Sequence, residues 1–372
     1  MIHTTQPQVA AFRLRRHHLI DQNPANLIIV CRNVCGMQAQ VAAAAELQFR
    51  ARIHDLNRTE IQAALWENRT LVKTSLMRQT LHIIPAEDFS IYITALKKSR
   101  LASLWHYRSK FGITQKEGDR LDDLVLELLA DGPMPQREVA ERILPKVGKS
   151  IQKYMELAWS IQLFRHALVE GLICYGPEQR KRATFVRVDR WLPEQKSVSE
   201  YEAKQILLRR YLRAYGPATA RDFAKWAGFP GKEAEEVWRS LSAELAEVSI
   251  DGQKASVLRE DVEQLTNSNP GKSILRLLPH FDPYLLAHVG KDHLVAPAHY
   301  KKVYRKAGWI FPVVLLDGRV IGVWSYKRRG KRLSLELEPF ENFSKTIYTA
   351  IEKETASLGR FLEIPVEIIR KT

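Results

Sequence analysis

Two stretches in the middle of the chain share one pattern, and this repeat constrains the fold more than any other feature. Residues 131–140 read DGPMPQREVA, and residues 215–224 read YGPATARDFA. Each follows an apolar run with helical spacing, at 121–129 and at 203–212. In each copy Gly-Pro is expected to end that helix, because proline cannot continue it and glycine tolerates the positive φ of a C-cap.

A second helix is expected directly after each Gly-Pro. Pro135 stands three positions before Glu138, and Thr219 stands three positions before Asp222. This is the spacing of a capping box at a helix start. There a short side chain accepts a hydrogen bond from the backbone amide of the acid, and the acid's side chain accepts one from the amide of the capping residue. Only Thr219 has a side-chain oxygen, so the pattern predicts a side-chain cap in the second copy alone.

Both copies continue with a further helix and end in strands. Residues 154–173 and 235–250 have amphipathic helical spacing. Strand-like segments follow at 183–188 and, after an Asp-Gly turn, at 254–260. Helix, Gly-Pro turn, helix, helix and two strands is the order of a winged helix-turn-helix.

The beginning of the chain follows the same plan less closely. Residues 59–68 are expected to form a helix capped by Thr59, and the β-forming residues at 71–84 to form the paired strands of a wing. The sequence therefore predicts an α+β fold with three tandem winged helix-turn-helix units, at 1–112, 113–196 and 197–264.

Residues 265–372 are predicted to form a β-rich C-terminal region. Strand-like runs occupy 274–281, 311–326 and 332–340, and Asp317-Gly318 fits a two-residue hairpin turn. Residues 343–362 have helical spacing.

Positive charge is concentrated at the two ends of the chain. The net charge is +15, from 57 Lys and Arg against 42 Asp and Glu. Residues 1–110 hold 15 basic and 7 acidic residues, and residues 271–372 hold 18 and 10, whereas residues 111–270 hold 24 and 25. This distribution indicates a polyanionic partner that both ends approach together.

The densest basic stretch surrounds Gly330, between two strand-like runs. It contains five cations in six positions: Lys327, Arg328, Arg329, Lys331 and Arg332. A hairpin tip of this kind suits sequence-neutral contact with phosphates. The alternative is a charged, solvated turn.

Other features exclude whole classes of protein. No apolar run approaches the roughly 18 residues of a membrane span, and the first residues lack a secretory signal. Three cysteines are too few for a disulfide scaffold, and no His/Cys set has zinc-ligand spacing. We expect a soluble, cytoplasmic protein.

Gln38 and Gln40 stand just before a helical run that starts at Val41. Two side chains separated by two positions share a face only where the backbone is extended, because on a helix they diverge by about 200°. If the pair acts together, residues 37–41 must be strand-like, looped or the irregular first turn of a helix. The alternative, which the spacing alone favours, is a pair of solvent-facing polar residues.

Several blocks of the chain, in order and spanning nearly its whole length, resemble the winged-helix DNA glycosylases of the AlkZ/YcaQ family. These blocks are residues 36–40 (GMQAQ), 65–84, 216–229, 277–288 and 317–324. Members of that family contain three tandem winged helices and remove alkylated bases, including cross-linked ones, from DNA. Gln38-Ala39-Gln40 matches the Gln-apolar-Gln motif of the AlkZ-like branch, although Ala39 is smaller than the middle residue often is.

The resemblance implies a monofunctional DNA glycosylase of base excision repair with Gln38 and Gln40 as its catalytic residues. Its expected partner is double-stranded DNA containing alkylated bases. We expect a monomer that needs no metal or redox cofactor and associates with the nucleoid when bound to DNA.

Amides suit this chemistry. An N7-alkylated purine is already cationic and leaves without a strong general acid, through a transition state that resembles an oxocarbenium ion. A Gln carbonyl can accept a hydrogen bond from the attacking water and place partial negative charge near the cation. Gln cannot take a proton as a carboxylate does, so neutral damaged bases should be cleaved poorly.

Further residues fall in or beside these blocks. Arg78 and His82 match a second family block and are expected to contact DNA, with structural hydrogen bonding in the wing as an equal alternative. Asp282 is expected to form a structural turn. His17 and His18, beside Arg15 and Arg16, are interpreted as part of a basic surface.

Two other functions remain open at this point. A non-enzymatic winged-helix transcriptional regulator would need basic recognition helices in the middle units, and the neutral middle argues against it. An interaction scaffold would leave Gln38 and Gln40 buried or scattered.

Overall fold

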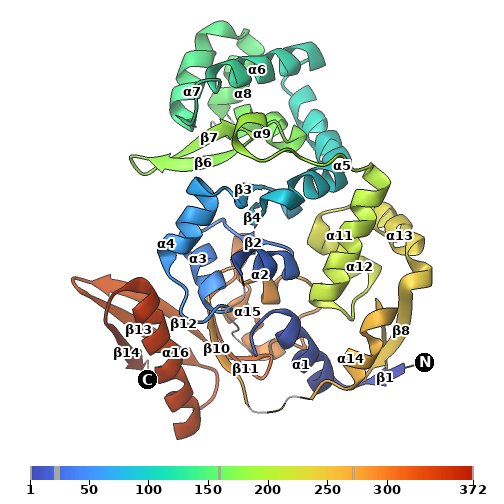
Figure 1. Ribbon diagram of the computed structural model, residues 1–372, viewed down its shortest axis with the longest axis vertical. Coiled ribbons are helices and arrows are strands. Elements are labelled where there is room, and N and C mark those ends of the chain that lie inside the picture. Colours follow the sequence, from blue (N-terminus) through green and yellow to red (C-terminus); the bar gives the residue numbers. More distant parts are fainter. Residues whose placement is uncertain (1, 21–25, 158–160, 270, 272, 371–372) are drawn as a thin grey trace. The chain divides into compact units, whose positions relative to one another are not determined.

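Helices and short sheets alternate along the chain in the computed structural model, which describes residues 2–20, 26–157, 161–269, 271 and 273–370 (Figure 1). The chain divides into two units. Unit 1 comprises Met1–Ile61, Leu208–Trp226 and Gly231–Thr372. Unit 2 comprises Gln62–Leu207 and Ala227–Pro230. The fold is mixed α+β, as the sequence predicts.

Unit 1 contains the beginning and the end of the chain. Its helices are α1 (Gln6–Arg16), α2 (Leu27–Asn33), α3 (Ala42–Arg50), α13 (Gly231–Ser240), α14 (Val262–Thr266), α15 (Tyr300–Val303) and α16 (Lys345–Leu362). Its strands are β1 (Ile2–Thr4), β2 (Met37–Gln38), β8 (Leu245–Ile250), β9 (Gln253–Leu258), β10 (Leu275–Leu278), β11 (Val313–Leu316), β12 (Arg319–Arg329), β13 (Arg332–Pro339) and β14 (Val366–Arg370).

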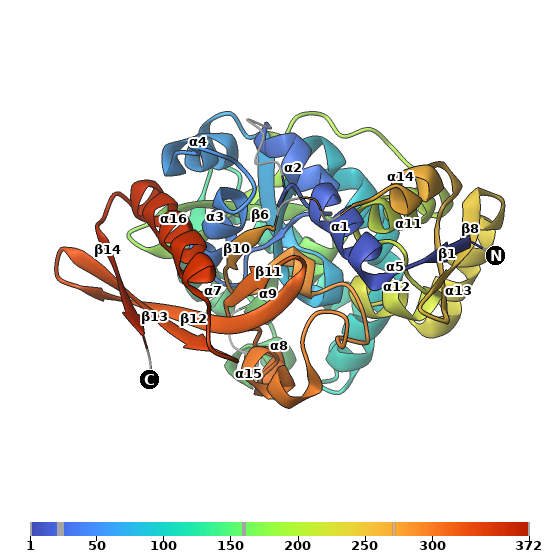
Figure 2. The same cartoon turned by 90° about the horizontal axis from the view of Figure 1, so that it is seen from below.

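Two sheets organise unit 1. The larger has the order β10-β11-β12-β13-β14, antiparallel except for the parallel pair β13-β14. α16 packs against β10 and β14 (Figure 2). The smaller has the order β1-β8-β9, in which Ile2 pairs with Val248 in parallel register. The predicted β-rich character of the C-terminal region is confirmed, as are its hairpin turn at Asp317-Gly318 and its final helix.

Unit 2 contains a hairpin and a helix-rich segment. Its helices are α5 (Phe89–Ser109), α6 (Gln115–Leu128), α7 (Gln136–Ile143), α8 (Lys149–Leu157), α9 (Ile161–Glu170) and α10 (Val188–Trp191), with a π-helical turn at Ala63–Glu67. Its strands are β3 (Leu71–Ser75), β4 (Leu81–Pro85), β5 (Met134–Pro135), β6 (Ile173–Gln179) and β7 (Arg182–Arg187). β3 and β4 pair antiparallel, as predicted for 71–84, and β5, β7 and β6 form a sheet in that order.

Three helices cross the boundary between the units: α4 (Arg58–Gln62), α11 (Glu200–Tyr215) and α12 (Ala220–Ala227). The second copy of the repeat has the predicted element order, whereas the first differs from it: the short strand β5 lies between α6 and α7, and two helices, α8 and α9, precede its strands where one is predicted. The first contains α6, α7, α8, α9, β6 and β7, and the second contains α11, α12, α13, β8 and β9. Within the stretch 154–173, residues 158–160 lie outside the described residues.

The cap at Thr219 is confirmed, and Pro135 provides no side-chain cap. The Thr219 hydroxyl accepts from the Asp222 amide at 3.2 Å, and the Asp222 carboxylate accepts from the Thr219 amide at 3.0 Å. These reciprocal bonds satisfy two of the unpaired amides at the start of α12.

The positive φ expected at both Gly-Pro turns occurs only at Gly132, where φ is 130°. At Gly216 the expectation is wrong. There a Cβ would lie 2.5 Å from the carbonyl oxygen of Leu212, so it is the close approach of the backbone that requires glycine.

Two predicted details at helix ends are also wrong. Residues 245–250 form strand β8 instead of continuing the helix predicted for 235–250, because Val248 and Ile250 are buried in a sheet between β1 and β9. At the start of α4, the amide of Thr59 donates to the side chain of Asn57 at 3.0 Å, so Asn57 is the capping residue.

Among the described residues, no helix is both long enough and apolar enough to cross a membrane.

Candidate active site

The Gln-Ala-Gln motif lies where β2 ends and before α3 begins. Gln38 is the last residue of β2, and Val41, with φ −115° and ψ 110°, is still extended before α3 starts at Ala42. The segment therefore meets the backbone condition for Gln38 and Gln40 to act together.

The two glutamines differ in exposure. Gln40 is exposed, whereas Gln38 retains 5% of its accessible surface and Ala39 retains 1%. The alternative of two solvent-facing polar residues is thus wrong for Gln38. The motif has one solvent-facing amide and one buried amide.

Gln48, on α3, fixes the backbone of the motif. Its side chain is fully buried, and its Nε2 donates to the carbonyl oxygen of Gln38 at 3.0 Å. The same nitrogen lies 3.2 Å from the carbonyl oxygen of His280 and 3.4 Å from that of Phe281. One buried amide therefore joins the end of β2 to the turn after β10.

A buried ion pair holds that turn against the end of α3. Arg52 donates to both carboxylate oxygens of Asp282, at 2.8 and 2.7 Å, and both side chains have no exposed surface. Arg52 also donates to the carbonyl oxygen of Gln48 at 2.9 Å, and the amide of Tyr284 donates to Asp282 at 3.0 Å. Asp282 is thus a structural residue of a turn, as predicted.

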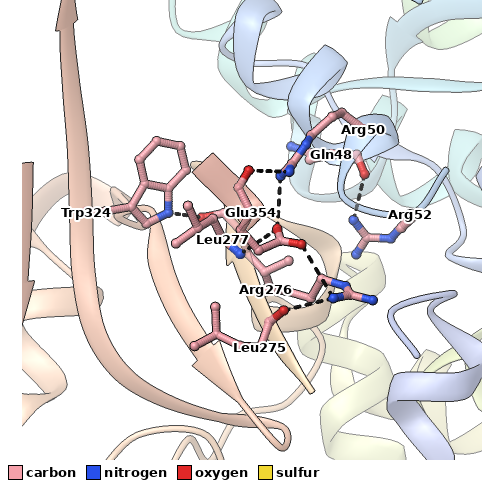
Figure 3. A network of polar contacts seen from close by, with 9 residues as sticks. Gln48, Arg50, Arg52, Leu275, Arg276, Leu277, Trp324 and Glu354 are labelled. Atoms are coloured by element: carbon pink, nitrogen blue, oxygen red, sulfur yellow. Dashed lines mark hydrogen bonds and ion pairs between the residues drawn. The ribbon is translucent and has the colours of Figure 1, made fainter. Parts of the chain in front are cut away.

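A second buried pair attaches α3 to α16 (Figure 3). Arg50 donates to the carboxylate of Glu354 at 3.1 Å and to its carbonyl oxygen at 2.7 Å. Arg276 and the amide of Leu277, on β10, also donate to the Glu354 carboxylate, at 3.4 and 3.3 Å. Sequence reasoning missed this network, since its partners lie about 80 to 300 residues apart. One feature of the sequence indicates such a network: Gln48, Arg50 and Arg52 alternate with apolar residues where the helix that starts at Val41 was expected to continue.

His17 is wrongly interpreted as a surface residue. It has no exposed surface and packs its ring against Tyr215 and Tyr284, with centroid distances of 5.0 and 5.2 Å. Burial, reinforced by the nearby charge of Arg52, holds the pKa of His17 well below its usual value, so the ring is neutral. His18 is partly buried and lies 2.9 Å from the side chain of Asn33.

Arg78 and His82 lie in unit 2, at the β3–β4 hairpin. Arg78 is partly buried with φ at 53°, and a Cβ on Gly228 would lie 3.2 Å from its amide nitrogen. His82 retains 2% of its surface, and its Nδ1 lies 3.0 Å from the carbonyl oxygen of Thr80. Burial and the charge of Arg78 lower the pKa of His82 to about 3, so at neutral pH it presents no positive charge to a phosphate.

The five predicted phosphate-binding cations lie in the β12–β13 hairpin, at the end of β12, in the turn and at the start of β13, and the tip of this hairpin projects from the sheet (Figures 1 and 2). Arg329 pairs with Arg332 in register, which leaves Gly330, with φ at 59°, and Lys331 as the turn. Arg328, Lys331 and Arg332 are exposed, and Lys327 lies 3.3 Å from Glu336. The side chain of Arg329 lies outside what the structure describes.

No group of three or more His, Cys, Asp or Glu side chains within the described ranges is arranged to hold a metal ion. The three cysteines are buried and form no disulfide.

Comparison with known proteins identifies the family. The model of the family described as DNA glycosylase AlkZ-like matches residues 31–361. An interstrand DNA cross-link repair glycosylase from Streptomyces sahachiroi is 31% identical over 379 residues, covering 97% of this chain and 98% of that protein. The solved structure of the Streptomyces sahachiroi DNA glycosylase AlkZ is similar with a TM-score of 0.82 and 28% identity, covering 99% of this chain and 100% of that one. The chain belongs to the AlkZ-like DNA glycosylase family.

Proposed function

We propose that this protein hydrolyses the N-glycosidic bond of N-alkylated, cationic purines in double-stranded DNA and that cross-linked bases are among its substrates. Membership of the AlkZ-like family supports the reaction, and the relative named as an interstrand cross-link repair glycosylase supports the substrate class. The observation that carries the proposal is the Gln-Ala-Gln motif at the end of β2, where the buried amide of Gln48 holds the carbonyl oxygen of Gln38.

We propose different roles for the two glutamines, because one is exposed and the other is buried. Gln40, which is exposed, accepts a hydrogen bond from the attacking water and holds it against the anomeric carbon. Gln38, which is buried, orients the site and adds partial negative charge beside the developing oxocarbenium ion. No general acid is required, because the leaving purine departs as a neutral base.

The rest of the fold serves DNA binding in this proposal. Residues 1–112, 113–196 and 197–264 form three winged-helix units, and residues 265–372 form the region that carries the basic hairpin. Arg328, Lys331 and Arg332 bind phosphates without reading sequence. Arg78 contacts DNA through its charge, and any contact by His82 is a neutral hydrogen bond. The protein acts as a monomer.

The experiment that tests the proposal measures release of N7-methylguanine from a duplex as alkali-labile abasic sites. Wild type is compared with Gln38→Ala and Gln40→Ala, and with Gln253→Ala as the matched control, since Gln253 is an exposed glutamine on β9. Removal of one catalytic hydrogen-bonding group typically costs about 100- to 1,000-fold in rate, so both catalytic variants should lose most activity and the control none. No release by wild type, or undiminished release by both catalytic variants, would defeat the proposal.

A further inference from the structure

A short segment of unit 1 combines exposed aromatic rings with a dense positive charge. Residues 300–309 read YKKVYRKAGW and contain four cations and no acid. Trp309 is 45% exposed and Tyr300 is 41% exposed. Trp309 is the one exposed tryptophan in the part of the chain that the structure describes.

The end of this segment is a closed turn that presents its residues to solvent. The amide of Arg305 donates to the carbonyl oxygen of Trp309 at 2.8 Å, and Tyr304 and Ile310 form an antiparallel bridge. Ala307 and Gly308 have φ at 56° and 76°, and a Cβ on Gly308 would meet nothing within 4 Å. The turn is therefore fixed by its own backbone bonds while its tip stays open.

Several of the cations have no acidic partner. Lys302 lies 2.9 Å from Glu338, but Lys301, Arg305 and Lys306 are exposed and form no ion pair among the described residues. Arg305 instead lies over the ring of Phe311, with its guanidinium carbon 3.6 Å from the ring centroid. Unpaired cations beside an exposed aromatic ring are typical of a surface that binds nucleic acid, because the cations bind phosphates and the ring stacks on a base.

Contacts through His280 and Gln48 link Trp309 to the catalytic motif. Its ring lies 5.4 Å from the ring of His280 and 5.2 Å from that of Phe281, between centroids. The carbonyl oxygen of His280 lies within 3.2 Å of the Gln48 nitrogen that also binds the carbonyl oxygen of Gln38. Two residues, His280 and Gln48, thus connect the exposed tryptophan to the carbonyl oxygen of Gln38, all within unit 1.

We propose that Trp309 stacks on a nucleobase left unstacked beside the lesion, while Arg305 and Lys306 bind the neighbouring phosphates. This inference rests on the proposed function, because it places Trp309 and the cations of its turn next to the base that the enzyme removes. An unstacked base offers an aromatic face to the exposed part of the Trp309 ring, and the adjoining backbone supplies two negative charges to the cations of the turn.

The test measures affinity of the full-length protein for two duplexes of one sequence, one intact and one with a single tetrahydrofuran abasic analogue flanked by 2-aminopurine. Trp309→Ala should reduce the preference for the abasic duplex by about 5- to 150-fold, the range expected for one base–aromatic stack. It should also abolish quenching of the 2-aminopurine. Trp309→Phe, which keeps a ring, should retain most of both signals, and Trp309→Gln replaces the alanine variant should that one not fold.

Lys306→Ala tests the phosphate contact separately. It should weaken binding to both duplexes equally and lower the slope of log affinity against log salt by about 0.9. Lys345→Ala, which removes an exposed lysine at the start of α16, is the matched control and should leave both measurements unchanged.

An unchanged preference in Trp309→Ala, or an equal loss in Trp309→Phe, would overturn the stacking role. Release of N7-methylguanine by wild type separates this failure from failure of the proposed function. If wild type releases the base and Trp309→Ala keeps the preference, the inference alone is wrong; if wild type releases no base, the proposed function is wrong whatever the affinities show.

Discussion

Gln38 and Gln40 are two positions apart, yet the fold gives them different surroundings. The sequence places both before a helix and permits them to act together, but it does not show which of them faces solvent. The carbonyl oxygen of Gln38 is held by Gln48, whose other contacts are at His280 and Phe281, far along the chain. Long-range contacts of this kind leave no periodic signal in a single sequence.

Gln48 should act as a positioning residue for Gln38. Gln48→Leu removes the donor shared by the carbonyl oxygens of Gln38 and His280, and an unsatisfied buried acceptor costs about 1–3 kcal/mol. We expect the single-turnover rate of base release to fall at least about 10-fold while the dissociation constant for DNA stays unchanged. A purely structural role predicts instead that stability falls and the rate of the folded fraction does not.

The Arg52–Asp282 pair should be essential to the stability of unit 1. Both side chains are fully buried, and removal of one partner of a buried pair costs about 3–5 kcal/mol because the other charge stays behind. Asp282→Asn should therefore lower the free energy of unfolding in urea by that amount. The double variant Arg52→Met with Asp282→Leu should lose less than the single variant; equal stability of Asp282→Asn and wild type would disprove this role.

At the scale of elements, local patterns predicted most helices and strands. The helix at 343–362, the hairpin at Asp317-Gly318 and the cap at Thr219 all follow from short-range rules and are found. The error at 245–250 has a clear cause. Its apolar residues fit helical spacing, but β1, more than 240 residues earlier in the chain, pairs with it and makes it a central strand.

The β12–β13 hairpin should bind DNA regardless of sequence. Arg328→Ala, Lys331→Ala and Arg332→Ala should each weaken binding equally on unrelated duplexes. Each should also reduce the salt slope by about 0.9, because each substitution removes one cation that neutralises a phosphate.

Lys327→Ala is the matched comparison within the same hairpin. Because Lys327 is already paired with Glu336, its removal should reduce affinity and the salt slope less than removal of the other three cations. Fluorescence anisotropy over a salt series measures these slopes, and unaltered slopes in all four variants would show that the hairpin is only a solvated turn.

His82, in β4, should make stability depend on pH in the acid range. Its folded pKa of about 3 lies below the value of 6.5 for an unperturbed histidine, because burial disfavours the charged ring. The unfolded chain therefore binds a proton first, so this contribution is complete above pH 6.5 and is lost as the pH falls from 6.5 towards 3.

For one such group the slope approaches about 1.4 kcal/mol per pH unit. Urea unfolding of wild type and His82→Gln between pH 4 and 7 checks this expectation, and the variant should show the shallower dependence. Parallel curves for the two proteins would contradict it.

For the whole molecule, the charge distribution predicts that residues 1–110 and 271–372 approach one polyanionic partner; residues 1–61 and 271–372 lie in unit 1, whereas residues 62–110 lie in unit 2. It overstated how much of that charge reaches the surface. Arg13, Arg50 and Arg52 are buried, and Arg13 donates to the carbonyl oxygens of Gly216 and Pro217 at 3.3 and 2.7 Å. Counting charges does not separate structural arginines from surface ones, because that distinction depends on tertiary contacts.

We propose that amides, rather than a carboxylate, catalyse loss of a base that already carries positive charge. This proposal is tested most directly by single-turnover cleavage of two duplexes that differ only at one base, N7-methylguanine or uracil. We expect N7-methylguanine to be released at least about 100-fold faster than uracil, since the glutamines hold a water but supply no proton to a neutral leaving group. Equal rates on the two duplexes would contradict it.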